Sequence, residues 1–168
     1  MAAYNLIATT TVGSGGAASI VFSGIPQTYT DLQIVYSARS NRSAVGDDMY
    51  IRFNGLSTNL SSIYSYGTGS SVASSSDAGI AFVGYLTGDT ATASTFSNGM
   101  SYIPNYTGST IKSVSTDSVT ENNATTAYTQ LNAGLWSSTS AITSITLDPF
   151  GTDFAQHSSA SLYGIKNS

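Results

Sequence analysis

Apolar and polar residues alternate along much of this chain. In two segments every second position is apolar: Leu32, Ile34 and Tyr36 in the first, and Met49, Ile51 and Phe53 in the second. A period of two places successive side chains on opposite faces of a β-strand, so each segment predicts a strand with one buried face. No segment repeats apolar residues at the helical period over three turns. The pattern therefore predicts an all-β protein.

Residues that favour turns separate the predicted strands. Strands are expected at residues 5–12, 18–23, 32–37, 48–54, 80–86, 95–104, 111–119, 125–136, 142–147 and 161–166. Residues 13–16 are predicted as the hairpin turn between the first two strands. Residues 56–79 are interpreted as a long loop, or as a short helical turn followed by a loop. In the strand at 125–136, the expected core residues are Tyr128, Leu131 and Leu135.

About nine or ten strands with short connections suit two antiparallel sheets packed face to face. The expected fold is an antiparallel β-sandwich, jelly-roll-like, forming a single domain over residues 1–168. Residues 1–16 are the expected amino-terminal strand and glycine turn, and they are a candidate contact arm. The candidate contacts within them are Tyr4, Leu6 and Ile7, because a terminal strand with few charges pairs readily with a neighbouring sheet edge.

Charged residues make up only 8 % of the chain, against about 25 % in a typical soluble protein. Serine and threonine take their place, with 30 Ser and 22 Thr among 168 residues. A disordered serine-rich chain has few aromatic residues, whereas this one carries 11 Tyr, 6 Phe and one Trp spread over its length. The composition therefore predicts a chain that is folded throughout and has a neutral, hydroxyl-rich surface.

The net charge is −4, and the cations are Arg39, Arg42, Arg52, Lys112 and Lys166. They form no cluster, so binding to nucleic acid is not expected, because it needs grouped cations that displace counterions from phosphates. The absence of cysteine excludes disulfides and thiolate metal sites. The sequence shows no signal peptide and no apolar run of membrane-spanning length. We therefore expect synthesis in a cytosol and no association with a membrane.

Catalytic chemistry has few candidates. The only histidine, His157, is expected in a turn rather than beside a nucleophile. Most acidic residues neighbour Gly, Ser, Thr or Asn, where a carboxylate caps a turn, so a glycosidase pair is not expected. Asp148 and Asp153 flank a turn and are the best candidates for calcium, but turn capping explains both. We expect no enzyme activity, no cofactor and no metal.

Four tyrosines flank predicted loops, namely Tyr64, Tyr66, Tyr102 and Tyr106. Exposed tyrosine rings stack on sugars, so these residues are candidate contacts to a glycan. A place at a sheet edge or in a subunit contact is the favoured interpretation of all four.

Several segments, which follow one another in order over nearly the whole chain, resemble a family of virion structural proteins of tailed bacteriophages. This family is common among phages of cyanobacteria and other aquatic bacteria. The segments are GIPQTYTDL (24–32), SARS (37–40), IRFNG (51–55), YIPNY (102–106), the block 112–123, GLW (134–136), AITSI (141–145) and the closing ASLYGI (160–165). His157 and Ser158 stand where the family often has Gly-Ser, a difference confined to a turn. The resemblance implies a jelly-roll-like sandwich on the particle surface, without catalytic residues.

The short length leaves no room for the attachment segment and shaft of a tail fibre. The expected function is therefore that of a capsid decoration (cement) protein, a homotrimer on the capsid surface of the virion that stabilises the head by binding the assembled major capsid protein. The alternative is a tail or tail-fibre-tip protein that binds a bacterial surface glycan.

Overall fold

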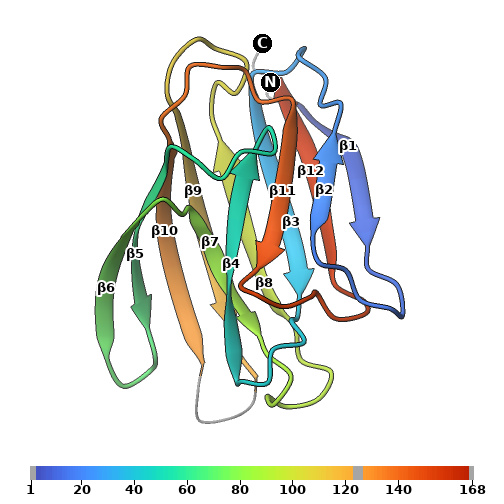
Figure 1. Cartoon of the computed structure of the whole chain (residues 1–168), viewed down its shortest axis with the longest axis vertical. Helices are drawn as coiled ribbons and strands as arrows, with labels where there is room; N and C mark the ends of the chain where they lie inside the picture. Colours follow the sequence, from blue (N-terminus) through green and yellow to red (C-terminus); the bar gives the residue numbers. More distant parts are fainter. Residues whose placement is uncertain (1–2, 123–126, 167–168) are drawn as a thin grey trace.

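The computed structural model describes residues 3–122 and 127–166. Over these residues the chain forms twelve β-strands and no helix. The strands lie in two antiparallel sheets that face each other, one of eight strands and one of four (Figure 1). This arrangement confirms the predicted all-β sandwich.

Within each sheet, hydrogen bonds join the strands in the following order. The large sheet consists of β1 (Ala3–Thr11), β12 (Ser159–Lys166), β3 (Asp31–Ala38), β8 (Ser97–Ile103), β9 (Lys112–Thr120), β10 (Tyr128–Trp136), β5 (Leu60–Gly67) and β6 (Val72–Ala78). The small sheet consists of β2 (Ile20–Ser23), β11 (Ser144–Pro149), β4 (Gly46–Phe53) and β7 (Phe82–Thr87).

Eight of the strands have the connectivity of a jelly roll. The half of the large sheet made by β1, β12, β3 and β8 faces the small sheet, with its order β2, β11, β4 and β7. In chain order these eight strands alternate between the sheets, except that β4 and β7 pair with each other. That order is produced by the two Greek keys of a jelly roll. The fold is therefore a jelly roll with two inserted hairpins, β5–β6 and β9–β10.

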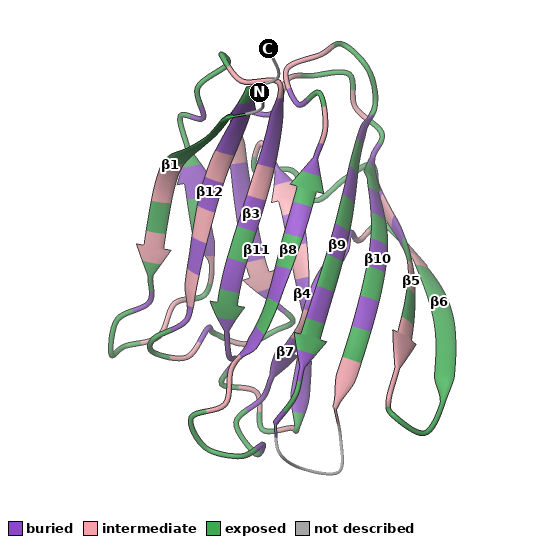
Figure 2. Ribbon diagram, turned by 180° about the vertical axis from the view of Figure 1, so that it is seen from behind, coloured by how far each residue is buried: buried purple, intermediate pink, exposed green. Residues whose placement is uncertain are grey.

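The inserted hairpins continue the large sheet beyond β8. We call β9, β10, β5 and β6 the extension. Strand β7, at the edge of the small sheet, packs on β9 and β10. Figure 2 shows the outer side of the large sheet, with β6 exposed along nearly all of its length. The extension therefore reaches past the edge of the small sheet.

The strand count exceeds the expected nine or ten because residues 60–67 and 72–78 pair as a hairpin. The prediction of a loop at residues 56–79 was therefore wrong. Strand β6 reads VASSSDA and is open to solvent on both faces. A strand of this kind carries no alternation of apolar residues that could reveal it.

The predicted hairpin turn at residues 13–16 was also wrong. Gly16 N–H donates to the Gly13 carbonyl at 3.1 Å, which closes a tight turn. However, β1 belongs to the large sheet and β2 to the small one, so this turn carries the chain between sheets. The predicted strand start at residue 125 lies outside the described residues.

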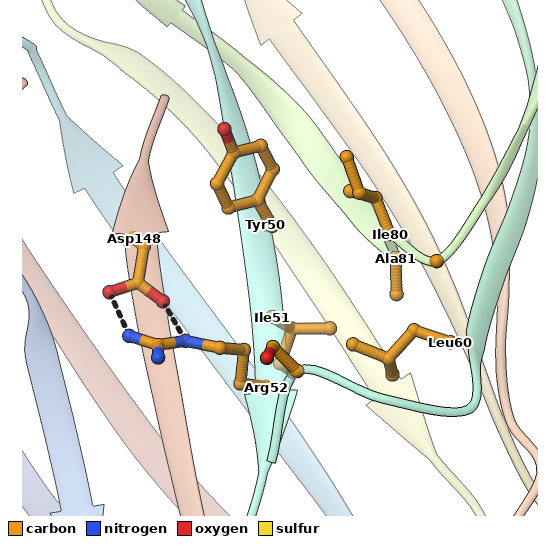
Figure 3. Close-up of a pocket in the computed structure, with 9 residues that line it drawn as sticks. Tyr50, Ile51, Arg52, Leu60, Ile80, Ala81 and Asp148 are labelled. Carbon is orange, nitrogen blue, oxygen red and sulfur yellow. Dashed lines mark hydrogen bonds and ion pairs between the residues drawn. The ribbon is translucent and has the colours of Figure 1, made fainter. Parts of the chain in front are cut away.

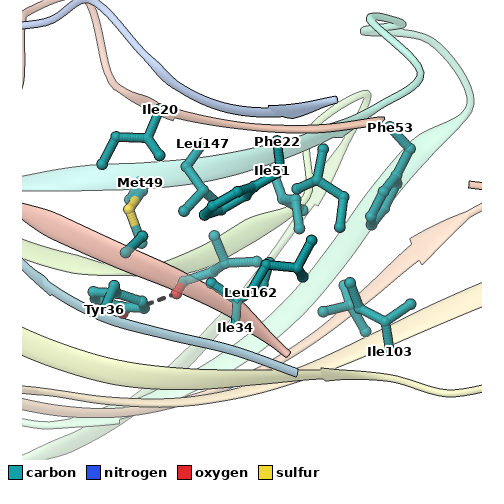
Figure 4. Close-up of a cluster of buried hydrophobic side chains, with 14 of the residues drawn as sticks. Ile20, Phe22, Ile34, Tyr36, Met49, Ile51, Phe53, Ile103, Leu147 and Leu162 are labelled. Carbon is teal, nitrogen blue, oxygen red and sulfur yellow. Dashed lines mark hydrogen bonds between the residues drawn. The ribbon is translucent and has the colours of Figure 1, made fainter. Parts of the chain in front are cut away.

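The hydrophobic core fills the space between the jelly-roll halves (Figure 4). Its members on β3 and β4 are the residues whose alternation predicted those strands: Leu32, Ile34, Tyr36, Met49, Ile51 and Phe53, all at most 3 % exposed. Leu162 on β12 and Leu147 on β11 pack into the same cluster. Periodicity therefore identified these core residues correctly.

In strand β10 of the extension, the buried inner face carries polar residues and the outer face carries apolar ones. Gln130 and Asn132 on β10 are buried, whereas Leu131 and Leu135 are 62 % and 37 % exposed on the opposite face. The predicted places of Leu131 and Leu135 in the core are therefore wrong. Trp136 ends the strand fully buried, with its ring centroid 5.5 Å from that of Phe53. The inner face of β10 thus changes from polar to apolar as it reaches the jelly-roll core.

The polar inner face is satisfied in part by backbone around β7. Ser62 on β5 donates to the Ile80 carbonyl at 3.0 Å. Thr120 on β9 donates to the Tyr85 carbonyl. The unpaired side of an edge strand presents backbone carbonyls as well as side chains, so hydroxyl groups beneath it can donate hydrogen bonds to these carbonyls.

Candidate functional site

A continuous group of aromatic rings lies where the extension meets the edge of the small sheet. Consecutive rings contact one another, with centroids 4.5–6.3 Å apart, in the order Phe150, Tyr50, Phe82, Tyr64, Tyr66, Tyr128 and Tyr85. We call this group the aromatic belt. It draws residues from four strands and the turn after β11. These separations are typical of favourable aromatic pairs.

Strand register explains why the tyrosines gather. Tyr66 lies opposite Gln130, and Tyr64 lies opposite Asn132, so both tyrosines are on the inner face of the extension. Tyr128 is two residues from Gln130 and shares that face. Their rings therefore project toward the small sheet.

The small sheet supplies the opposite side of the site. Asp48 on β4 and Tyr85 on β7 are directly paired across the strands. The Tyr85 ring lies so close to Gly46 that a Cβ atom there would come within 2.1 Å of it. The lack of a side chain at Gly46 is thus what allows the Tyr85 ring to approach β4 so closely.

Together these residues enclose a pocket of about 170 Å³ that we call the tyrosine pocket. It is lined by Asp48, Tyr64, Tyr66, Tyr85, Tyr128 and Gln130. Its volume greatly exceeds the roughly 10–15 Å³ that one water molecule needs. The pocket can therefore admit a small organic group.

Asp48 is the charged group of the tyrosine pocket. Burial, followed by the charge of Asp47, raises the pKa of Asp48. The nearby cation Arg42 is held by Asp47, with Nη1 3.1 Å from Oδ1. Thr152 also donates to Asp47, at 2.9 Å. Asp47 is thus a structural carboxylate, whereas Asp48 faces the pocket without a hydrogen bond or ion pair from the described residues.

Two further groups set the chemistry of the pocket. Gln130 is only 8 % exposed, and its Oε1 accepts no hydrogen bond from the described residues. Burial and the neighbouring Tyr128 raise the pKa of Tyr85 to about 12, so its hydroxyl stays protonated at neutral pH. The pocket therefore offers aromatic faces, a carboxylate and an unused amide oxygen.

Replacing Asp48 by Asn is expected to stabilise the protein at neutral pH. The folded-state pKa of Asp48 lies above its ordinary value of 3.8, so the folded state binds the proton more tightly than the unfolded state. Wild-type stability therefore rises as the pH falls through the interval between the folded pKa and 3.8, and the gain from Asp48→Asn shrinks over the same interval. Urea unfolding of both proteins across this range measures the difference. A variant that is less stable than the wild type at neutral pH would contradict the raised pKa of Asp48.

A second hollow, of about 340 Å³, lies along the same edge of the small sheet (Figure 3). Leu60, Ile80 and Ala81 form an apolar wall, and Tyr50 of the aromatic belt lines it as well. On its other side the Arg52 guanidinium is held by Asp148 through two hydrogen bonds, at 2.6 and 2.7 Å.

This ion pair corrects the interpretation of Asp148. Both of its carboxylate oxygens accept from Arg52, and the residue lies within β11, so it does not cap a turn. Asp153 follows in the next connection, where its carbonyl accepts from Asn41 N–H. The described residues contain no group of three or more His, Cys, Asp or Glu side chains that could hold a metal ion.

The structure separates the four tyrosines proposed as glycan contacts. Tyr64 and Tyr66 lie together in the tyrosine pocket, with rings 28° from parallel. Tyr102 is on the outer face of the large sheet, and its hydroxyl donates to Asp31 at 2.8 Å. Tyr106 is fully buried and donates to the Pro26 carbonyl, so its predicted exposure was wrong.

The candidate contacts near the amino terminus lie on β1. Residues 3–11 pair with β12 as an edge strand of the large sheet. Tyr4 and Leu6 are exposed, whereas Ile7 packs against the core. His157 is exposed in the turn before β12, with φ of 73°, which confirms the predicted turn.

Sequence reasoning missed Asp48, Tyr85 and Gln130 as parts of a site and placed Tyr128 in the core. The available signal was the shared spacing of Tyr64-x-Tyr66 and Tyr128-x-Gln130, which puts each pair on one face of a strand. Nothing in the linear pattern indicated that the two strands would be neighbours.

In the described part of the chain, no helix is long and apolar enough to cross a membrane. The chain was also compared with protein-family models, curated proteins and solved structures, and none of these matched. The fold and the site thus define a jelly-roll sandwich with an inserted sheet extension and an aromatic pocket at its junction.

Proposed function

We propose that this protein is a non-enzymatic structural component of a phage virion, a decoration protein that binds the assembled major capsid protein and stabilises the head. The observation that carries the proposal is the broad outer face of the large sheet. Jelly rolls are common among viral capsid and lectin domains, which is consistent with this function.

The outer face is nearly uncharged and exposes large apolar side chains among small polar ones. Seven large side chains on five neighbouring strands are 37–65 % exposed there: Val35, Ile63, Met100, Tyr102, Val119, Leu131 and Leu135. By strand register, the charged strand residues on this face are Asp31, which is buried, and Asp117. Monomeric proteins rarely expose wide apolar surfaces, so such a face suits permanent contact with another protein.

A homotrimer is proposed as the assembled form, with contacts through β1. This strand leaves one edge unpaired within the described chain and exposes Tyr4 and Leu6 beside it. Unpaired strand edges readily accept a strand from a neighbour.

The absence of enzymatic activity is part of the same proposal. His157 stands in an exposed turn, and the carboxylates of Asp31, Asp47 and Asp148 are engaged by hydrogen bonds within the fold. The glycan-binding alternative retains Tyr64 and Tyr66 but loses Tyr106 to the core.

Placing a charge on the outer face is expected to weaken capsid binding about tenfold or more. Leu131→Lys adds an ammonium group to the centre of an apolar contact, where it must be desolvated without a partner. The matched control is Val21→Lys, at an exposed position of the small sheet. Co-sedimentation with assembled shells measures binding. Equal losses in both variants, or a copy number in purified particles typical of tail proteins, would contradict the proposal.

A further inference from the structure

The tyrosine pocket is built to favour positive charge. Its rings come from Tyr64, Tyr66, Tyr85 and Tyr128, and each aromatic face is the negative pole of a ring quadrupole. Adjacent rings are inclined by 28–55°, so they surround the space from several directions. Several aromatic faces around one space are the arrangement that proteins use to hold organic ammonium groups.

The polar groups of the pocket reinforce this preference. Asp48 supplies a negative charge, and no cation is among the described residues that line the pocket. The nearest arginine, Arg42, is engaged by Asp47. Asp77 on the inner face of β6 adds to the negative potential at Asp48. Arg42 offsets part of this potential, but Asp48 forms no ion pair with a described residue.

The hydrogen-bonding capacity points to a ligand that donates. Gln130 lines the pocket, and its Oε1 is buried beside it and accepts no hydrogen bond from the described residues. When it is ionised, a carboxylate can accept hydrogen bonds but cannot donate them. A protonated primary amine carries three N–H donors and no acceptor, so it complements both groups.

We propose that the tyrosine pocket is a binding site for a protonated alkylamine. The ammonium group is held between the Asp48 carboxylate and Gln130 Oε1, and its alkyl chain lies against the tyrosine rings. This site is separate from the outer face that we assign to capsid contact, and it does not depend on that assignment.

A neutral saccharide is a poorer match for the same pocket. A sugar stacks one flat ring face on an aromatic side chain and carries no charge that could balance a carboxylate. Here four rings enclose about 170 Å³, and the non-aromatic groups are an anion and an amide. An unpaired anion is costly to bury unless a cation joins it.

The test is an NMR titration of the full chain with n-butylammonium chloride, 1-butanol and methyl α-D-glucopyranoside at matched ionic strength. We expect n-butylammonium to shift the ring signals of the pocket tyrosines, and 1-butanol and the glucoside to leave them unchanged. Asp48→Asn should weaken n-butylammonium binding about tenfold. The matched control Asp117→Asn removes the same charge from the outer face and should have no effect. Because Asp48→Asn is expected to be stabilising, loss of the fold will not obscure the result.

The amine can be a small solute or a lysine side chain of a partner protein. An acetylated, amidated Gly-Lys-Gly peptide distinguishes these sources: tighter binding than n-butylammonium indicates a lysine, and exclusion of the peptide indicates a small amine. Equal shifts with 1-butanol, preferential binding of the glucoside, no shift with n-butylammonium, or equal binding by wild type and Asp48→Asn would each overturn the proposal.

Discussion

Trp136→Ala is expected to lower the free energy of unfolding by about 3–5 kcal/mol. The indole is fully buried at the end of β10 and packs against Phe53 of the small sheet. Removing it deletes a large apolar contact and leaves a cavity between two sheets that cannot both move inward to close it. The expected effect is a loss of sandwich stability and not a local change in the extension.

The neighbouring residue provides a matched control. Leu135 directly precedes Trp136 but points to the outer face and is 37 % exposed, so Leu135→Ala should cost less than about 1 kcal/mol. Urea unfolding followed by far-ultraviolet circular dichroism measures both variants without relying on tryptophan fluorescence. Comparable losses at the two positions would show that the register of β10 is wrong.

Arg39→Met should cost about 3 kcal/mol or more. The Arg39 side chain is 8 % exposed, and its guanidinium donates to the carbonyls of Thr92, Thr95, Asp89 and Ala91 at 2.9–3.2 Å. Hydrogen bonds from a charged donor contribute about 1.5–3 kcal/mol each, although they are not additive. Without the guanidinium, four carbonyls of the β7–β8 connection lose this partner together.

The effect should be local as well as global. Amide hydrogen exchange in residues 88–96 is expected to accelerate in Arg39→Met before the strands are affected. Arg39→Lys should not restore protection, because an ammonium group cannot span carbonyls that a planar guanidinium bridges. Lys166→Met, at an exposed position, serves as the control and should change stability by less than about 0.5 kcal/mol. Unchanged exchange in the connection would refute the role of Arg39.

Periodicity succeeded where one face of a strand packs on the core and the other meets solvent. In β3 and β4 this condition holds, so Ile34 and Ile51 were identified as core residues from the sequence. In β10 the condition fails, because the outer face carries Leu131 and the inner face carries Asn132. The same alternation was present, but it marked the opposite face.

The candidate site illustrates a second limit of prediction from the sequence. Tyr64 and Tyr66 were recognised as potential ligand contacts because of their residue type and their position beside predicted loops. Asp48 and Gln130 were not recognised, because they come from different sheets and are 82 residues apart in the sequence. Residue type indicates what a side chain can do, but only long-range strand pairing places complementary groups around one space.

By itself, the sequence determined the strand class, most strand positions and an antiparallel sandwich, since β-propensity, alternation and turn residues act over a few positions. Tertiary structure alone decided that two hairpins extend one sheet beyond the other. It also decided that the extension buries polar side chains beneath β7 and exposes leucines on its outer face. The physical reason is that burial depends on what lies opposite a strand. A full sheet selects apolar residues, whereas the edge of β7 presents carbonyls that accept hydrogen bonds from hydroxyl groups such as those of Ser62 and Thr120.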